Sequence, residues 1–184
     1  MIDMMALQTR MVDGLQEYLA PYGVTAIIER DQDAPKPPYP FVGFKWLTLT
    51  PEEGTLRRTR EVVPSSDPRF PLDVQYTYIR NPVLTLSVTC FDRDGTRIND
   101  ITQAAYDWWS IPELASDWME PVGATVVEVT AITDRDTLLD EQIERRQGFD
   151  VRMRVVDVVA VTVPTIERVL VTGMGGEVAQ EIDL

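Results

Sequence analysis

The chain has 184 residues, of which 44% are hydrophobic, and its formal net charge of −13 reflects 30 acidic against 17 basic side chains. This length and composition are typical of one globular domain, and without an apolar run of about 18 residues the chain has no ordinary membrane-spanning helix. The acidic excess disfavours nucleic-acid binding, which needs cations to neutralise phosphates, and the single Cys90 excludes an intrachain disulfide.

The N-terminal part of the chain predicts one helix followed by two strands. Residues 4–19 place an apolar side chain at every third or fourth position, as an amphipathic helix requires, and Pro21 ends the pattern. Residues 24–30 predict a strand, and a proline-rich connector over 31–40 leads to a second strand over 41–50. The N-terminus lacks the pattern of a secretory signal, so we expect a water-soluble protein made in a cytosol.

Residues 51–71 contain four prolines and mixed charges, which predicts a long hairpin arm or loop that projects from the domain. Within this segment Arg57, Arg58 and Arg60 form the densest basic cluster of an acidic chain. Two interpretations stay open for the cluster. It is either a solvated part of the arm or a surface that pairs with an acidic neighbouring subunit.

Two strands and a second helix follow the arm. Residues 72–79 and 83–91 alternate apolar with polar side chains, the pattern of half-buried strands, and Cys90 falls on the apolar side. A turn over 92–95 leads to a helix that ends before Pro112. Its apolar stripe reaches the tryptophans at 108 and 109.

The tryptophans of this region are candidates for contact with a partner. Because adjacent positions on a helix do not face the same way, we expect only one of Trp108 and Trp109 to lie in the core. The other meets either solvent or a partner. Trp118 follows in residues 113–120, which we expect to be irregular. Tryptophan often anchors protein interfaces, so Trp109 and Trp118 are candidate interface residues.

The C-terminal part predicts β structure. A strand over 123–133 and a polar link over 134–141 precede the clearest alternation of the chain, over 149–155, where one face is apolar and the other charged. Gly148 beside this run suggests a β-bulge. The order of elements predicts an α+β fold, with a largely antiparallel or mixed β-sheet packed by two main helices. We expect residues 173–184 to form a flexible tail.

The residues that most enzymes use are missing or isolated. The sequence has no histidine, which excludes histidine-based triads and zinc sites, and one cysteine cannot form a redox pair. Carboxylates occur in residues 92–94 and 134–141, where turns explain them; cation binding at a subunit boundary is the alternative for the second group. We therefore expect no catalytic, cofactor-binding or metal-binding residues.

Residues 144–152, ERRQGFDVR, resemble a recurrent strand of phage neck or tail terminator proteins. The order of an N-terminal helix, an extended arm, a strand and a helix ending in aromatic residues also fits that family, over most of residues 1–165. The resemblance implies a structural protein of the virion neck, made in the cytoplasm of a host bacterium. It further implies a ring, expected to be hexameric, that caps the tail tube and joins it to the head connector while DNA passes through an acidic lumen.

The resemblance also implies one tail-terminator-like domain over 1–184, with copies of itself, tail tube and sheath proteins, and head connector proteins as partners. Within the matching strand, Asp150 and Arg152 are expected to form ion pairs within the sheet or across subunits. A head-completion or stopper protein of the same connector and, from another class, a carboxylate metal-dependent hydrolase are the alternatives. The candidate interface residues are Arg57, Arg58, Arg60, Trp109, Trp118, Arg145, Arg146, Asp150 and Arg152.

Overall fold

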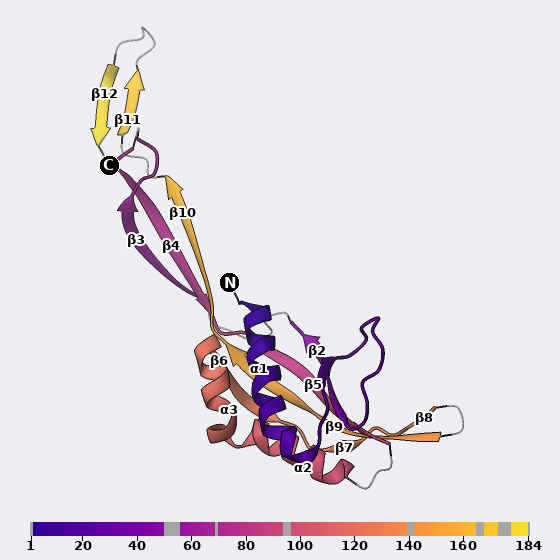
Figure 1. Cartoon of the computed structure of the whole chain (residues 1–184). Coiled ribbons are helices and arrows are strands. Elements are labelled where there is room, and N and C mark those ends of the chain that lie inside the picture. Colours follow the sequence, from indigo (N-terminus) through magenta and orange to yellow (C-terminus); the bar gives the residue numbers. More distant parts are fainter. Residues whose placement is uncertain are drawn as a thin grey trace. The chain divides into compact units, whose positions relative to one another are not determined.

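The computed structural model divides the chain into two compact units (Figure 1). Unit 1 comprises Met1–Thr55 and Asn81–Asp157, and unit 2 comprises Leu56–Arg80 and Val158–Leu184. The expectation that residues 1–184 form one domain stays a prediction. The structure describes residues 2–49, 56–68, 70–93, 97–139, 142–164, 168–172 and 178–183.

Helix α1 (Met4–Leu19) begins unit 1 and covers its core. The Asp3 side chain caps the helix by accepting a hydrogen bond of 2.9 Å from the backbone N–H of Ala6. A short 3₁₀ turn, η1 (Ala20–Tyr22), then ends at Gly23, whose φ of 79° suits glycine. The apolar stripe expected from the sequence is buried at Leu7, Met11, Leu15 and Leu19.

The helical layer of unit 1 has a third helix, where the sequence predicted an irregular segment. Helix α2 (Ile98–Ser110) is followed by α3 (Pro112–Met119) and a 3₁₀ turn, η2 (Glu120–Val122). The expectation of an irregular segment over 113–120 is therefore wrong. Proline suits the first position of a helix, where its missing N–H is not needed, so Pro112 starts a new helix as well as ending the previous one.

The main sheet of unit 1 has the strand order β1-β2-β5-β9-β6, and the short strands β7 and β8 also pair with β9. Strand β1 runs parallel to β2, whereas every other pairing described in this sheet is antiparallel. Helix α2 packs on β5 and β9, so the expected α+β class is confirmed. The strands are β1 (Ile27–Glu29), β2 (Phe41–Thr48), β5 (Val83–Asp92), β6 (Ala124–Val129), β7 (Thr133–Asp134), β8 (Thr137–Leu139) and β9 (Gln142–Val155).

Unit 2 contains a three-stranded sheet of order β10-β4-β3, formed by β3 (Arg57–Pro64), β4 (Leu72–Arg80) and β10 (Asp157–Pro164). Strands β3 and β4 form an antiparallel hairpin, which places a strand within the segment expected to be an arm or loop. Residues 51–55 and 69 of that segment lie outside the described residues.

Two further strands of unit 2, β11 (Arg168–Thr172) and β12 (Val178–Asp183), pair antiparallel. In the segment expected to be a flexible tail, β12 is thus a strand, while residues 173–177 and 184 lie outside the described residues.

The core of unit 1 lies between the helices and the sheet, and it contains both adjacent tryptophans. Trp108 and Trp109 are each 1% exposed, and their rings meet edge to face with centroids 4.7 Å apart. The expectation that only one of them is buried is wrong. Helix α2 contacts the sheet as well as α1 and α3, so more than one face of the helix is covered.

Candidate functional site

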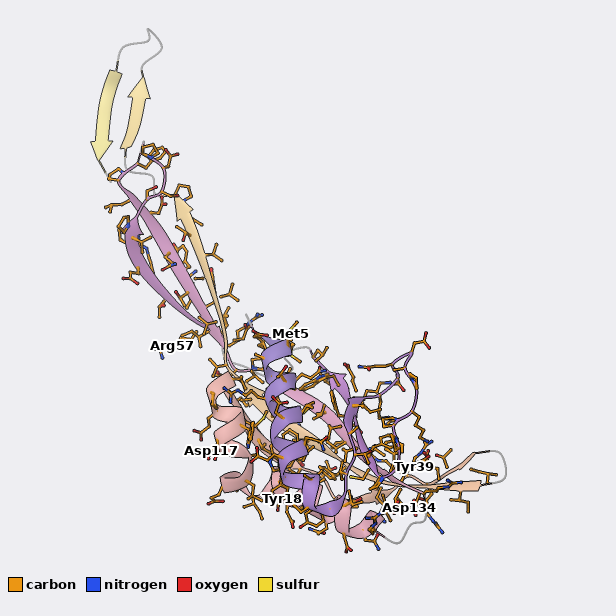
Figure 2. All side chains as sticks on the ribbon, in the orientation of Figure 1. Met5, Tyr18, Tyr39, Arg57, Asp117 and Asp134 are labelled. Atoms are coloured by element: carbon orange, nitrogen blue, oxygen red, sulfur yellow. The ribbon has the colours of Figure 1, made fainter. Side chains whose placement is uncertain are left out.

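The three clustered arginines lie on β3 of unit 2, and Figure 2 shows Arg57 at the start of that strand. All three side chains are exposed. Because side chains alternate along a strand, Arg58 and Arg60 share one face of the sheet and Arg57 lies on the other. The Arg58 guanidinium lies 5.2 Å from the ring centroid of Tyr76 on β4, within cation–π range. The cluster is thus presented on an ordered, extended backbone.

Unit 2 also exposes apolar side chains on its strands. Val62 on β3 is 52% exposed, and Val161 and Val163 on β10 are 44% and 37% exposed. The described residues of unit 2 include no helix that could cover its sheet. A small sheet is stabilised when its apolar side chains pack against another element or another protein. These exposed side chains are therefore suited to contact with another protein.

On the polar face of the unit 1 sheet, Arg135 binds side chains from two central strands. Its guanidinium donates to the hydroxyls of Ser87 (2.8 Å) and Thr89 (3.0 Å) on β5 and to the Asp150 carboxylate (3.1 Å) on β9. Both hydroxyl-bearing residues are buried. Arg135 therefore provides hydrogen bonds to two hydroxyl groups that are shielded from water.

Gly148 gives Arg135 the space for this arrangement. A Cβ at Gly148 would lie 2.8 Å from Nη1 of Arg135 and would overlap the carbonyl oxygen of Val88. The pairing of β9 with β5 runs without a shift through Gly148, which pairs with Thr89, so the expectation of a bulge is wrong. Glycine occurs here because another side chain crosses the strand closely.

Arg145 and Arg146 bind the Asp136 carboxylate. Its oxygens accept hydrogen bonds from the guanidinium of Arg145 (2.5 Å) and from the backbone N–H of Arg146 (2.7 Å). Burial alone would raise the pKa of Asp136, but these hydrogen bonds outweigh it and lower the pKa from its ordinary value. This acid of the 134–141 group is thus an ion-pair partner, and residues 140 and 141 lie outside the described residues.

The Glu144 carboxylate is buried among cationic and aromatic side chains. It bonds to the ammonium of Lys36 and the hydroxyl of Tyr39, and it accepts a hydrogen bond of 2.6 Å from Nε of Arg146. Figure 2 labels Tyr39, which belongs to the proline-rich connector over 31–40. The cluster therefore attaches that connector to β9.

The charged residues of the ERRQGFDVR segment all have partners within unit 1. Arg145 and Arg146 pair with Asp136 and Glu144, Asp150 pairs with Arg135, and Arg152 donates to Glu128 at 3.0 Å. For Asp150 and Arg152 the sequence predicted ion pairs within the sheet: Arg152 pairs with Glu128 of the neighbouring strand β6, whereas the partner of Asp150 is Arg135, which lies between β7 and β8. A role for the same residues across subunits stays a prediction.

A groove with a volume of about 390 Å³, which the sequence did not predict, lies in unit 1 beside β6. Helices α2 and α3 form one wall, and Trp109 lies at its base. Glu120 and Glu128 also line the groove. Part of it is formed by α3, so the groove could not be foreseen while residues 113–120 were expected to be irregular.

The half-buried Trp118 lies on another surface of α3. A Cβ on Gly14 of α1 would be 2.6 Å from its ring, so glycine allows the two helices to approach closely. Trp118 lines a hollow with Tyr18 and Leu114, apart from the groove beside β6. As an interface residue it remains a candidate.

In the turn over 92–94, the structure describes Asp92, whose carboxylate binds backbone N–H groups. The buried Asp92 accepts hydrogen bonds from the backbone N–H groups of Arg93 (2.8 Å) and Arg97 (3.3 Å), and residues 94–96 lie outside the described residues.

In the described part of the chain, no three acidic or cysteine side chains converge as metal ligands would. Nor does any described helix have the length and apolar character needed to cross a membrane.

The chain matches a known protein family. A family model described as phage neck terminator protein matches residues 9–178, which is more than half of the chain and includes parts of both units. A search of curated proteins found no match.

Proposed function

The chain belongs to the phage neck terminator family, whose members are structural proteins of the virion, and we propose that it forms a ring that caps the tail tube. In this proposal the ring is a hexamer and joins the tube to the head connector. The family match over residues 9–178 is the observation that carries the proposal. The same match favours a terminator over the head-completion alternative and offers no support for a metal-dependent hydrolase.

Two features of the molecule support assembly as the mode of action. Unit 2 exposes apolar and arginine side chains on a sheet that no described helix of the unit covers. Unit 1 has a groove beside β6, the last strand of its sheet. Surfaces of two different kinds on one chain allow head-to-tail contacts, which close into a ring when the rotation between copies permits.

The charge of the chain fits the passage of DNA through such a ring. Nearly all of the net charge of −13 belongs to unit 1, whose residues are 1–55 and 81–157. A lumen wall with an acidic excess repels phosphate groups, so DNA slides through without specific binding. The ring therefore acts by shape and charge, in keeping with a structural protein family.

Electron microscopy of the purified chain with tail tubes assembled without it tests this proposal. We expect a ring at one end of each tube, and mass photometry should show six copies of the 20.9-kDa chain. Purified head connectors serve as the comparison, because a stopper protein would bind them in preference to tubes. A chain that stays monomeric and leaves tube ends bare would overturn the proposal.

A further inference from the structure

The groove beside β6 has the features of a site for an added strand. Strand β6 pairs with β9 on one side and is the last in the order of its sheet, so its outer edge has no partner among the described strands. Val127 of this strand is 49% exposed. Open strand edges are ready to bind another strand through backbone hydrogen bonds. The apolar part of the groove is formed by Tyr106, Trp109, Ala115, Met119, Val126 and Val129.

Charge restricts which strand can bind there. Glu120 and Glu128 line the groove, and Glu128 also accepts a hydrogen bond of 3.0 Å from Arg152 on β9. Residues 98–122, which include the helical wall of the groove, contain five carboxylates and no lysine or arginine. Figure 2 labels one of these five, Asp117, on α3. An acidic strand would be repelled, whereas a basic strand would gain ion pairs at the rim as it entered.

Strand β3 is the strand of this chain that fits. It is the edge strand of the unit 2 sheet and combines three exposed arginines with the exposed Val62. Among the described strands at a sheet edge, it has the largest positive charge. Strand β10, at the other edge of the same sheet, contains no lysine or arginine and one aspartate, and β1 ends in Glu29.

We propose that β3 of one copy adds to the edge of β6 in a second copy. Arg58 and Arg60 then face Glu120 and Glu128, and Val62, which lies on the same face of β3, enters the apolar groove. The inference deepens the proposed function and rests on it, because it names the two surfaces that join neighbouring copies of the ring. The contact uses a different surface on each partner, so every copy offers one strand and one groove to its neighbours.

Charge reversal on each surface separately tests the proposal. One variant carries Arg57→Glu, Arg58→Glu and Arg60→Glu, and a second carries Glu120→Lys and Glu128→Lys. Sedimentation velocity should show that each variant alone associates roughly tenfold or more weakly than the wild type, because ion pairs become repulsions. An equimolar mixture should recover association, since it restores one native contact and one with both charges exchanged.

Matched variants control for charge and folding. Arginine-to-lysine changes at the three β3 positions keep the charge of that strand. Asp13→Lys with Glu17→Lys replaces two acids by lysine, as the Glu120→Lys and Glu128→Lys variant does, but at exposed positions of α1. Both controls should associate like the wild type. Circular dichroism checks that all variants are folded.

The possible outcomes separate this inference from the proposed function. If both reversal variants form the same rings as the wild type, the ring stands and the β3–β6 contact is overturned. Loss of association that mixing does not recover also overturns the contact, because it shows that the two surfaces do not meet. A wild-type chain that remains monomeric, alone and with tail tubes, overturns the ring as well.

Discussion

Replacing Gly148 with alanine should destabilise unit 1, because the new methyl group has no space. It would lie 2.8 Å from Nη1 of Arg135 and overlap the carbonyl oxygen of Val88. That carbonyl belongs to β5 at the centre of the sheet, so relief requires a shift of paired backbone. Arg135 can move more easily, but only by giving up its hydrogen bonds to Ser87 and Thr89.

The size of the effect follows from two opposing contributions. Overpacking a close-packed site typically costs about 1–3 kcal/mol. Alanine in place of glycine restores roughly 0.4–1 kcal/mol by reducing the entropy of the unfolded chain. Because the methyl group meets backbone as well as a side chain, we expect the clash to dominate, with a net loss of about 2 kcal/mol in the free energy of unfolding.

Urea unfolding followed by tryptophan fluorescence measures this loss. All tryptophans of the chain lie in unit 1, so the signal reports on that unit. In an Arg135→Ala background the cost of Gly148→Ala should fall by at least about 0.5 kcal/mol, since one of the two clashes is gone. A Gly148→Ala variant within about 0.5 kcal/mol of the wild type would refute the steric argument. If Gly148→Ala costs the same free energy of unfolding with and without Arg135→Ala, the Arg135 side chain does not contribute to the clash.

Glu144→Gln should lower the free energy of unfolding by about 1–3 kcal/mol, measured by urea titration, because the buried carboxylate loses its ion pairs while the partly exposed Lys36 and Arg146 remain hydrated; an unchanged midpoint would contradict this. The pKa of Asp136 is lowered from 3.8, so its stabilising contribution is complete above that pH and is lost as the pH falls through the lower folded value. Unfolding midpoints of the wild type and Asp136→Asn should therefore differ near about pH 6 and converge near about pH 2, and a constant difference would count against the ion pairs. Burial raises the pKa of the Cys90 thiol to about 12, so a thiol reagent at about pH 8 should label the protein only after unfolding, and rapid labelling of the folded chain would show that the site opens.

Local patterns in the sequence were sufficient for much of the fold. The spacing of Leu7, Met11 and Leu15 predicts α1, and the alternation in 83–91 and 149–155 predicts β5 and the second half of β9. These patterns succeed because burial on one side of an element repeats with the period of that element. The α+β class follows from their order along the chain.

Features that depend on contacts distant in sequence could not be predicted in the same way. Both tryptophans of α2 are buried because α1, α3 and the sheet surround that helix, which no local period reveals. Gly148 is required by Arg135, which the sequence places in a polar link with no sign of its destination. The groove beside β6 is partly formed by α3. This helix is too short to show a clear apolar periodicity, and in the sequence its first residue, Pro112, indicates only the end of the preceding helix.

The pairing of β2 with β5 has a consequence for how this gene can diversify. Thr48 and Thr85 are partners across these two neighbouring strands, so the chain departs from the main sheet and returns to it at one place. The intervening stretch, which includes β3 and β4, can be lengthened, shortened or exchanged for a tight turn without changing the ladder at its two ends. Substitutions in this stretch can therefore adapt the protein to new neighbours in the particle without changing the residues of the hydrophobic core.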